Sequence, residues 1–195
     1  MRFVSLFCVL ALLGAAGSAT AQPVSKPSSP PPPPPLGPEL WRGARIGMSQ
    51  NDVTALFPKA TPSKGEILPT GARSGLTLPV TVGGAAANAQ FYFDTSGLQT
   101  IIIDRPDVVA GKTDENLAKA RRIIADVTAA WGAPASCIDR RRLAALNCTW
   151  KLEKTQTVVS YRDVAGFAPS LNIAFRKRDD LKIWAPGPVK KLKLR

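Results

Sequence analysis

One segment of the chain occurs twice in a weakly similar form. The residues Val-Thr-Ala-Leu-Phe-Pro-Lys-Ala at 53–60 return 74 positions later as Val-Thr-Ala-Ala-Trp-Gly-Ala-Pro at 127–134. Each copy closes a helix-like stretch and is followed by strand-like runs, and self-similarity at a fixed offset indicates a repeated structural unit. The repeated segment therefore predicts an α+β fold of two tandem units, 40–110 and 111–180. Each unit is expected to be a helix packed on a small antiparallel sheet.

The helix of each unit can be placed from its end signals. Ser49 is followed three residues later by Asp52, which is the pattern of a capping box, and Pro58 ends the first helix. Thr113 is expected to be the N-cap of the second helix, which an apolar stripe extends to about Trp131. The residues expected on the apolar face of the first helix are Val53, Leu56 and Phe57. Those expected on the second helix are Leu117, Ala120, either Ile123 or Ile124, Val127, and either Ala130 or Trp131.

Alternating or β-branched runs predict three strands in each unit. They are expected at 75–82, 88–93 and 98–103 in the first unit, and near 146–152, 157–163 and 171–176 in the second. Pro79 cannot donate a hydrogen bond to a neighbouring strand, so its strand is expected at a sheet edge. Asp94 and Gly97 predict a hairpin turn between the second and third strands.

The first 21 residues have the features of a secretory signal peptide. Arg2 precedes an apolar run at 3–14, and the small residues Ala19 and Ala21 lie just before Gln22. The run is shorter than the roughly 18–20 apolar residues that a membrane-spanning helix needs. We therefore expect cleavage before Gln22 and a periplasmic or secreted protein.

A proline-rich segment follows the leader at 22–39. It includes six consecutive prolines at 30–35 and has few residues that could enter a core. Such a composition favours an extended polyproline II conformation. We expect a disordered stalk between the leader and the folded part.

Two cysteines, Cys137 and Cys148, remain once the leader is removed. An even number of cysteines in an exported protein favours a disulfide, and closing so short a loop contributes about 3 kcal/mol in the chain-entropy model. The chain has no histidine, so these two residues do not make a tetrahedral zinc site, and their spacing is not that of a Cys-x-x-Cys redox motif. A stapled hairpin is expected, with Arg140, Arg141 and Arg142 near its tip.

The lack of histidine also removes the usual general base of hydrolases. Asp104 and Asp107 form the best remaining carboxylate pair, but aspartate at the end of a strand more often shapes a turn. The sequence has no glycine-rich phosphate loop. We expect no catalytic activity, no cofactor and no metal.

The charge of the chain is strongly positive. Without Arg2 of the leader, 25 basic and 14 acidic residues leave a net charge of +11, and residues 181–195 contribute +5 of it. In an exported protein such charge favours anionic lipid or lipopolysaccharide over nucleic acid as a partner. This tail mixes basic and apolar side chains, a composition that suits binding to an anionic interface; the residues concerned are Trp184, Lys190, Lys191 and Lys193. A tail that only keeps the protein soluble would have the same composition.

The segment Gly-Met-Ser-Gln-Asn-Asp-Val at 47–53, followed by Leu-Phe-Pro at 56–58, resembles a signature of small envelope proteins of the SmpA/OmlA/BamE type. The two-unit layout is also similar to that of β-lactamase inhibitory protein. Taken together, these two resemblances cover residues 43–176. They imply protein–protein binding through sheet surface and hairpin loops, in outer-membrane assembly or in enzyme inhibition. The lipid-attachment cysteine typical of the SmpA/OmlA/BamE proteins is missing here, and the proline-rich stalk stands in its place.

These features predict a non-catalytic, protein-binding module of the cell envelope. An inhibitor of a periplasmic or extracellular enzyme and a basic protein that binds anionic envelope surfaces are the alternatives. The residues expected on the binding surface are Tyr92, Asp94, Arg140, Arg141, Arg142, Trp184, Lys190, Lys191 and Lys193.

Overall fold

The computed structural model describes residues 35–140 and 144–178, which belong to a compact unit that begins at Pro35. Among these residues, no helix combines the length and the apolar character that crossing a membrane requires. The expected leader, most of the expected stalk, the tip residues Arg141 and Arg142 and the basic tail lie outside the described residues.

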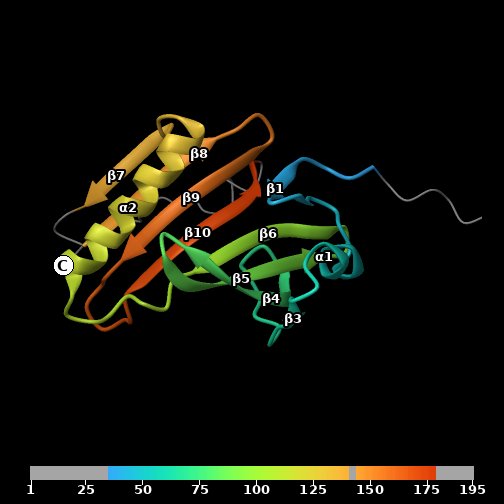
Figure 1. Cartoon of the computed structure of the whole chain (residues 1–195), viewed down its shortest axis with the longest axis horizontal. Coiled ribbons are helices and arrows are strands. Elements are labelled where there is room, and N and C mark those ends of the chain that lie inside the picture. The colour runs from blue at the N-terminus through green and yellow to red at the C-terminus, as the bar shows by residue number, and fades with distance from the viewer. Residues whose placement is uncertain (1–34, 141–143, 179–195) are drawn as a thin grey trace, which may run out of the picture. The chain divides into compact units, whose positions relative to one another are not determined.

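An eight-stranded antiparallel sheet forms the main part of the fold, with the strand order β3-β4-β5-β6-β10-β9-β8-β7 (Figure 1). Its first four strands are β3 (Thr61–Pro62), β4 (Arg73–Val82), β5 (Ala85–Asp94) and β6 (Gly97–Asp104). The other four are β7 (Ser136–Arg140), β8 (Ala145–Lys151), β9 (Thr155–Arg162) and β10 (Ser170–Lys177). A separate two-stranded sheet pairs β1 (Glu39–Trp41) with β2 (Ala44–Arg45), and the helices are α1 (Gln50–Leu56) and α2 (Thr113–Trp131).

The expected fold of two helix-on-sheet units is wrong. Strand makes up 45% of the described residues and helix 19%, and the strands form one large sheet accompanied by two helices. The last strands of the two sets, β6 and β10, pair directly, so that Ile102 lies opposite Ala174. Two small sheets would each expose a row of unpaired backbone groups along these strands, and joining the strands satisfies both rows. The expected boundary near residue 110 follows β6, and strands from both sides of it are neighbours in the same sheet.

A single hydrophobic core covers one face of the sheet. Val53 of α1 and both Ala120 and Ile123 of α2 join it, and Figure 1 shows α2 lying across β8 and β9. The strands contribute every second side chain, as a half-buried sheet requires. These strand residues include Leu76, Leu78, Ala87, Ala89, Phe91, Phe93, Ile101, Ile103, Leu146, Cys148, Trp150, Val159, Tyr161, Leu171, Ile173 and Phe175.

Two partly buried aromatic residues, Trp41 and Phe57, pack against aromatic residues of this core. The Trp41 ring lies 5.7 Å from the Phe57 ring, 6.5 Å from the Phe91 ring and 6.2 Å from the Phe175 ring, measured between centroids. Phe57 and Phe91 are also 5.4 Å apart. Trp41 comes from β1, so these contacts hold the start of the folded part against the central strands.

The local signals of the first helix are largely confirmed. The Ser49 hydroxyl accepts a hydrogen bond from the Asp52 amide, and the Asp52 carboxylate accepts one from the Ser49 amide, which completes the capping box. These bonds to Ser49 lower the pKa of the Asp52 carboxyl below its usual range. Leu56 was expected on the apolar face and is exposed instead, because the helix ends at this residue.

The second helix ends at the expected residue, Trp131, but begins one residue earlier than expected. Its N-cap is Lys112, whose side chain makes no capping hydrogen bond, and Thr113 is the first helical residue. The Thr113 hydroxyl donates to the Asp163 carboxylate at 2.6 Å. The threonine therefore ties α2 to the end of β9 rather than capping the helix, a role that depends on a residue fifty positions away.

The cysteine hairpin is confirmed, and it contains a strand that the sequence did not reveal. Cys137 of β7 lies directly opposite Cys148 of β8, and their sulfur atoms are within disulfide-bonding distance. All five residues of β7 are exposed, so no apolar alternation marks this edge strand. The turn between Asp94 and Gly97 is also confirmed.

Candidate functional site

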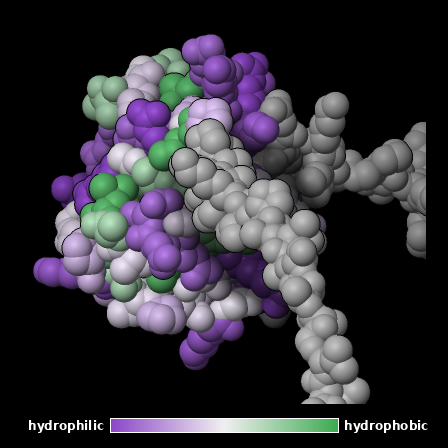
Figure 2. Space-filling model, turned by 90° about the vertical axis from the view of Figure 1, so that its right-hand side faces the viewer, coloured by the Kyte–Doolittle hydropathy of each residue, from purple (hydrophilic) through white to green (hydrophobic). Residues whose placement is uncertain are grey.

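The face of the sheet opposite the core is the candidate functional site. The side chains that alternate with the core residues point to this face, and neither α1 nor α2 packs on it. Figure 2 shows small hydrophobic groups separated by hydrophilic ones on the side of the molecule that it presents. That view looks along the sheet from the right-hand side of Figure 1. We call the sheet face opposite the core the open face. Its central residues are Gln90, Tyr92, Thr100, Ile102, Asp104, Asn147, Gln156, Val158, Ser160, Arg162, Asn172, Ala174 and Arg176.

A strap, residues 63–72 between β3 and β4, covers one part of the open face. The Tyr92 hydroxyl donates to the Glu66 carboxylate of the strap at 3.0 Å. The Ser74 amide donates to the Glu66 carbonyl at 2.7 Å, and the hydroxyls of Ser63 and Ser74 are hydrogen-bonded. The strap is therefore fixed at both ends of its path and forms a wall beside the uncovered part of the face.

Tyr92 lies on the face that the alternation predicts, but it is not a surface residue. Only 2% of it is exposed, because the strap packs over it. Burial disfavours the phenolate, and the hydrogen bond that the phenol donates to the Glu66 carboxylate favours the protonated form, so the pKa of Tyr92 is raised well above its ordinary value. Tyr92 was expected on the binding surface, but in the structure it is buried and holds the strap in place.

Asp104 lies beside this anchor. Its carboxylate accepts a hydrogen bond from the Gln90 amide nitrogen at 3.2 Å, and the Gln90 amide oxygen lies 2.8 Å from the Tyr92 hydroxyl, whose one proton it shares with Glu66. Burial raises the pKa of the Asp104 carboxyl, and the nearby charge of Glu66 raises it further. A raised pKa means that the ionised carboxylate is less stable here than in the unfolded chain.

Replacing Asp104 with asparagine is therefore expected to stabilise the protein at neutral pH. The amide oxygen that this substitution introduces can still accept the bond from Gln90, and the repulsion by Glu66 is removed. A group with a raised folded pKa destabilises the fold above that pKa, so the gain should shrink as the pH falls through it. Urea unfolding of wild type and Asp104→Asn at pH 7 and pH 4 measures this, and equal gains at both pH values would contradict the electrostatic cause.

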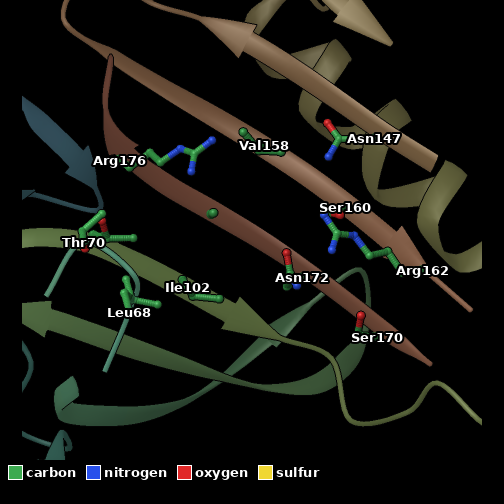
Figure 3. Close-up of a pocket in the computed structure, with 12 residues that line it drawn as sticks. Leu68, Thr70, Ile102, Asn147, Val158, Ser160, Arg162, Ser170, Asn172 and Arg176 are labelled. Atoms are coloured by element: carbon green, nitrogen blue, oxygen red, sulfur yellow. The ribbon is translucent and has the colours of Figure 1, made fainter. Parts of the chain in front are cut away.

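A pocket of about 190 Å³ opens in the part of the face that the strap leaves uncovered (Figure 3). Leu68 and Thr70 of the strap form one wall, and β6, β8, β9 and β10 supply the rest. Val158 and Ser160 are almost fully buried and form its floor. The complete lining is Leu68, Thr70, Thr100, Ile102, Asn147, Val158, Ser160, Arg162, Ser170, Asn172, Ala174 and Arg176.

Two arginines flank this pocket. Figure 3 shows the side chains of Arg162 and Arg176 extending over the face toward the middle of the pocket from opposite sides. With its amide turned to suit both groups, Gln156 accepts a hydrogen bond from Arg176 Nη2 at 2.8 Å and a second from Nε. Arg162 is exposed and forms no ion pair within the described part of the chain.

The two candidate catalytic carboxylates take part in separate networks. The Asp107 carboxylate accepts hydrogen bonds from Nε and from Nη2 of Arg105, each at 2.8 Å, and Arg105 Nη1 donates to the Val82 carbonyl at 2.7 Å. Lys119 of α2 lies 3.3 Å from the same carboxylate. Asp104 instead binds Gln90 on the open face. Asp104 was expected to shape the exit from β6, but it is Asp107 that makes the contacts there, through Arg105 to the end of β4 and through Lys119 to α2.

The remaining residues expected on the binding surface do not gather at the pocket. The Asp94 carboxylate accepts hydrogen bonds from the Ser96 amide and hydroxyl and from Gln99. Asp94 therefore stabilises the turn in which it lies. Arg140 is exposed at the end of β7, opposite Ala145. Six others lie outside the described residues, namely Arg141, Arg142, Trp184, Lys190, Lys191 and Lys193.

Sequence reasoning missed the residues that form the pocket. Arg162 and Arg176 lie in strands that were expected, and strict alternation from Tyr161 and Phe175 places both on the polar face. The sequence pattern does not predict that β6 pairs with β10. This pairing brings Thr100 and Ile102 next to these arginines. Within the described residues, no group of three metal-ligating side chains is present.

The open face gives this chain a polar pocket between two arginines, beside a wall that a buried tyrosine holds in place. The resemblance of residues 43–176 to small envelope proteins stays a prediction. Comparisons of the chain with protein families, with characterised proteins and with solved structures give no match.

Proposed function

We propose that this chain is an exported, non-catalytic module of the cell envelope that binds another protein through the open face. The proposal depends on one observation, which is that α1 and α2 both pack on the same face of the sheet. Its core face is packed by α1 and α2, while the opposite face presents a polar pocket and carries neither of these helices in the part of the chain that the structure describes.

The make-up of this surface supports protein binding more than catalysis. A rigid antiparallel sheet holds the pocket residues, and a preorganised surface loses little conformational entropy when a partner binds. The arginines and amides around the buried Val158 combine a polar rim with a small apolar floor, as interface patches do. The chain has no histidine, and Asp107 is held by Arg105 and Lys119.

A matched pair of substitutions tests the use of the open face. Ala174→Arg fills the middle of the pocket with a bulky charge, while Ala125→Arg adds the same group to the exposed surface of α2. The full chain serves as bait in envelope extracts, and each retained protein is then purified and titrated directly. Ala174→Arg is expected to weaken binding of the true partner at least tenfold, because a clash in a central pocket affects the best-packed part of an interface.

Ala125→Arg should leave that affinity unchanged, and thermal unfolding verifies that both variants are folded. Equal binding by wild type and Ala174→Arg would overturn the assignment of the open face. Binding only to anionic vesicles or lipopolysaccharide, lost in high salt and insensitive to Ala174→Arg, would instead favour the basic surface-binding protein. A partner that is an enzyme and loses activity in the complex would identify the chain as an inhibitor.

A further inference from the structure

We propose that the pocket between Arg162 and Arg176 receives a carboxylate from an aspartate or glutamate side chain of the partner protein. This inference rests on the proposed function and adds the chemistry of the partner to it. The partner would thus present an acidic side chain at the centre of its contact surface.

The lining of the pocket is rich in hydrogen-bond donors. Each guanidinium carries five N–H groups in a planar fork that matches the two oxygens of a carboxylate. Asn147 and Asn172 add amide N–H groups between the arginines, and none of the described residues that line the pocket carries a carboxylate. The hydroxyls of the lining, from Thr70, Thr100, Ser160 and Ser170, can donate as well.

The strand register places the two arginines at opposite ends of the pocket. Arg176 lies across from Gln156, six residues before Arg162 on β9, which is about 20 Å along the strand direction. Both side chains extend over the face toward each other, as Figure 3 shows. An anionic group bound between them is approached by positive charge from two sides, and the amides of Asn147 and Asn172 lie in the intervening space.

The floor is built to hold these donors in place. Gln156 is fully buried and binds the Arg176 guanidinium, which fixes the direction of that side chain. Thr100, Val158 and Ser160 are also buried, although neither α1 nor α2 lies over them. Charge-assisted hydrogen bonds at a partly desolvated site are about twice as strong as neutral ones, so such a site favours a carboxylate over a neutral amide of the same shape.

The size of the pocket selects a side chain over a larger ligand. Small-molecule sites usually enclose about 300–1,000 Å³. The volume here is about 190 Å³, which suits a single side chain. The net charge of +12 on the full chain also favours an acidic partner, because complementary charge speeds encounter.

The test uses the full chain and three probes of defined chemistry. They are a capped hexaglutamate peptide, the matching hexaglutamine peptide and free glutarate, each titrated while amide chemical shifts are followed by NMR. Hexaglutamate is expected to shift the signals of Asn147, Ser160 and Asn172 in a saturable manner, and hexaglutamine to leave them in place. Arg162→Gln should weaken hexaglutamate binding at this site about tenfold, since it removes a charge-assisted contact.

Arg122→Gln is the matched control, because Arg122 is an exposed arginine of α2 and the same charge is lost on the core side of the sheet. Asn172→Asp is a second variant that keeps the size of the side chain and adds a negative charge inside the pocket, so it too should weaken hexaglutamate binding. Equal losses with Arg122→Gln and Arg162→Gln, or no shifts at the pocket, would overturn the proposal. Glutarate binding as tightly as the peptide would assign the site to free carboxylates and overturn the choice of a protein side chain.

The failure of this inference can be distinguished from the failure of the proposed function. If Ala174→Arg abolishes binding of the envelope partner while Arg162→Gln changes neither that binding nor the peptide titration, the open face still binds protein and only the carboxylate assignment fails. If Ala174→Arg leaves partner binding intact, the proposed function fails as well.

Discussion

Replacing Phe91 with alanine is expected to lower the free energy of unfolding by about 4 kcal/mol. Phe91 is fully buried in the middle of the core, and its ring lies 5.4 Å from Phe57 and 6.5 Å from Trp41. Truncation removes the burial of the ring and leaves a cavity that this rigid sheet cannot close, a combination that costs about 3–5 kcal/mol for phenylalanine. Urea unfolding followed by tryptophan fluorescence and circular dichroism measures the change.

Phe167→Ala is the matched control for that substitution. Phe167 is 77% exposed, so the same truncation there should change the free energy of unfolding by no more than about 0.5 kcal/mol. A loss below about 1 kcal/mol for Phe91→Ala would show that β1 and α1 do not pack on the central strands as described.

The second large effect is expected at the exit from β6. Asp107→Ala should destabilise the fold by about 3 kcal/mol, because it removes the partner of the nearly buried Arg105 guanidinium. The double substitution Arg105→Met with Asp107→Ala should recover part of this loss, since no buried charge is then left without its partner. Recovery of stability in the double variant is therefore the diagnostic result.

The effect of Asp107 should also depend on pH in a defined direction. The hydrogen bonds from Arg105 hold the pKa of the Asp107 carboxyl below its ordinary value, and Lys119 lowers it further. The stabilisation is fully present above the unfolded pKa of about 3.9 and is lost as the pH falls through the folded pKa. The difference between wild type and Asp107→Ala should thus be constant from pH 7 to about pH 5 and shrink below that range.

Asp126→Ala serves as the control, because Asp126 is an exposed acid of α2. Its substitution should change stability by no more than about 0.5 kcal/mol at each pH. Equal effects of Asp107→Ala and Asp126→Ala, or a double variant less stable than Asp107→Ala, would contradict the role given to the Arg105 pair.

Local structure could be predicted from the sequence where the signal is local. The capping box at Ser49, the helix to Trp131 and the turn at Asp94 all depend on residues within a few positions of one another. Thr113 was misread because its hydroxyl is used by Asp163. That contact is set by the folded sheet, and no spacing within the helix could reveal it.

The sheet and the candidate site depend on long-range pairing. Alternation assigns faces to the strands, yet it does not say which strand edges meet, so the joining of β6 to β10 was not foreseen. The same limit explains Tyr92: alternation placed it on the open face, but only the path of the strap shows that it is buried. The strands that carry Arg162 and Arg176 were predicted, but the pocket between these arginines was not, because it depends on which strands pair.

The β6–β10 junction also sets an order of events during folding. Its paired residues are 68 to 76 positions apart, whereas consecutive hairpins such as β4–β5 and β5–β6 bring together near neighbours. Closing a long loop has a larger entropic cost than closing a short one, and contacts of high sequence separation slow folding. The local hairpins are therefore expected to form early and the junction late. Cutting the chain between β6 and α2 would turn this late step into an encounter between two molecules, and the yield of folded protein would then depend on fragment concentration.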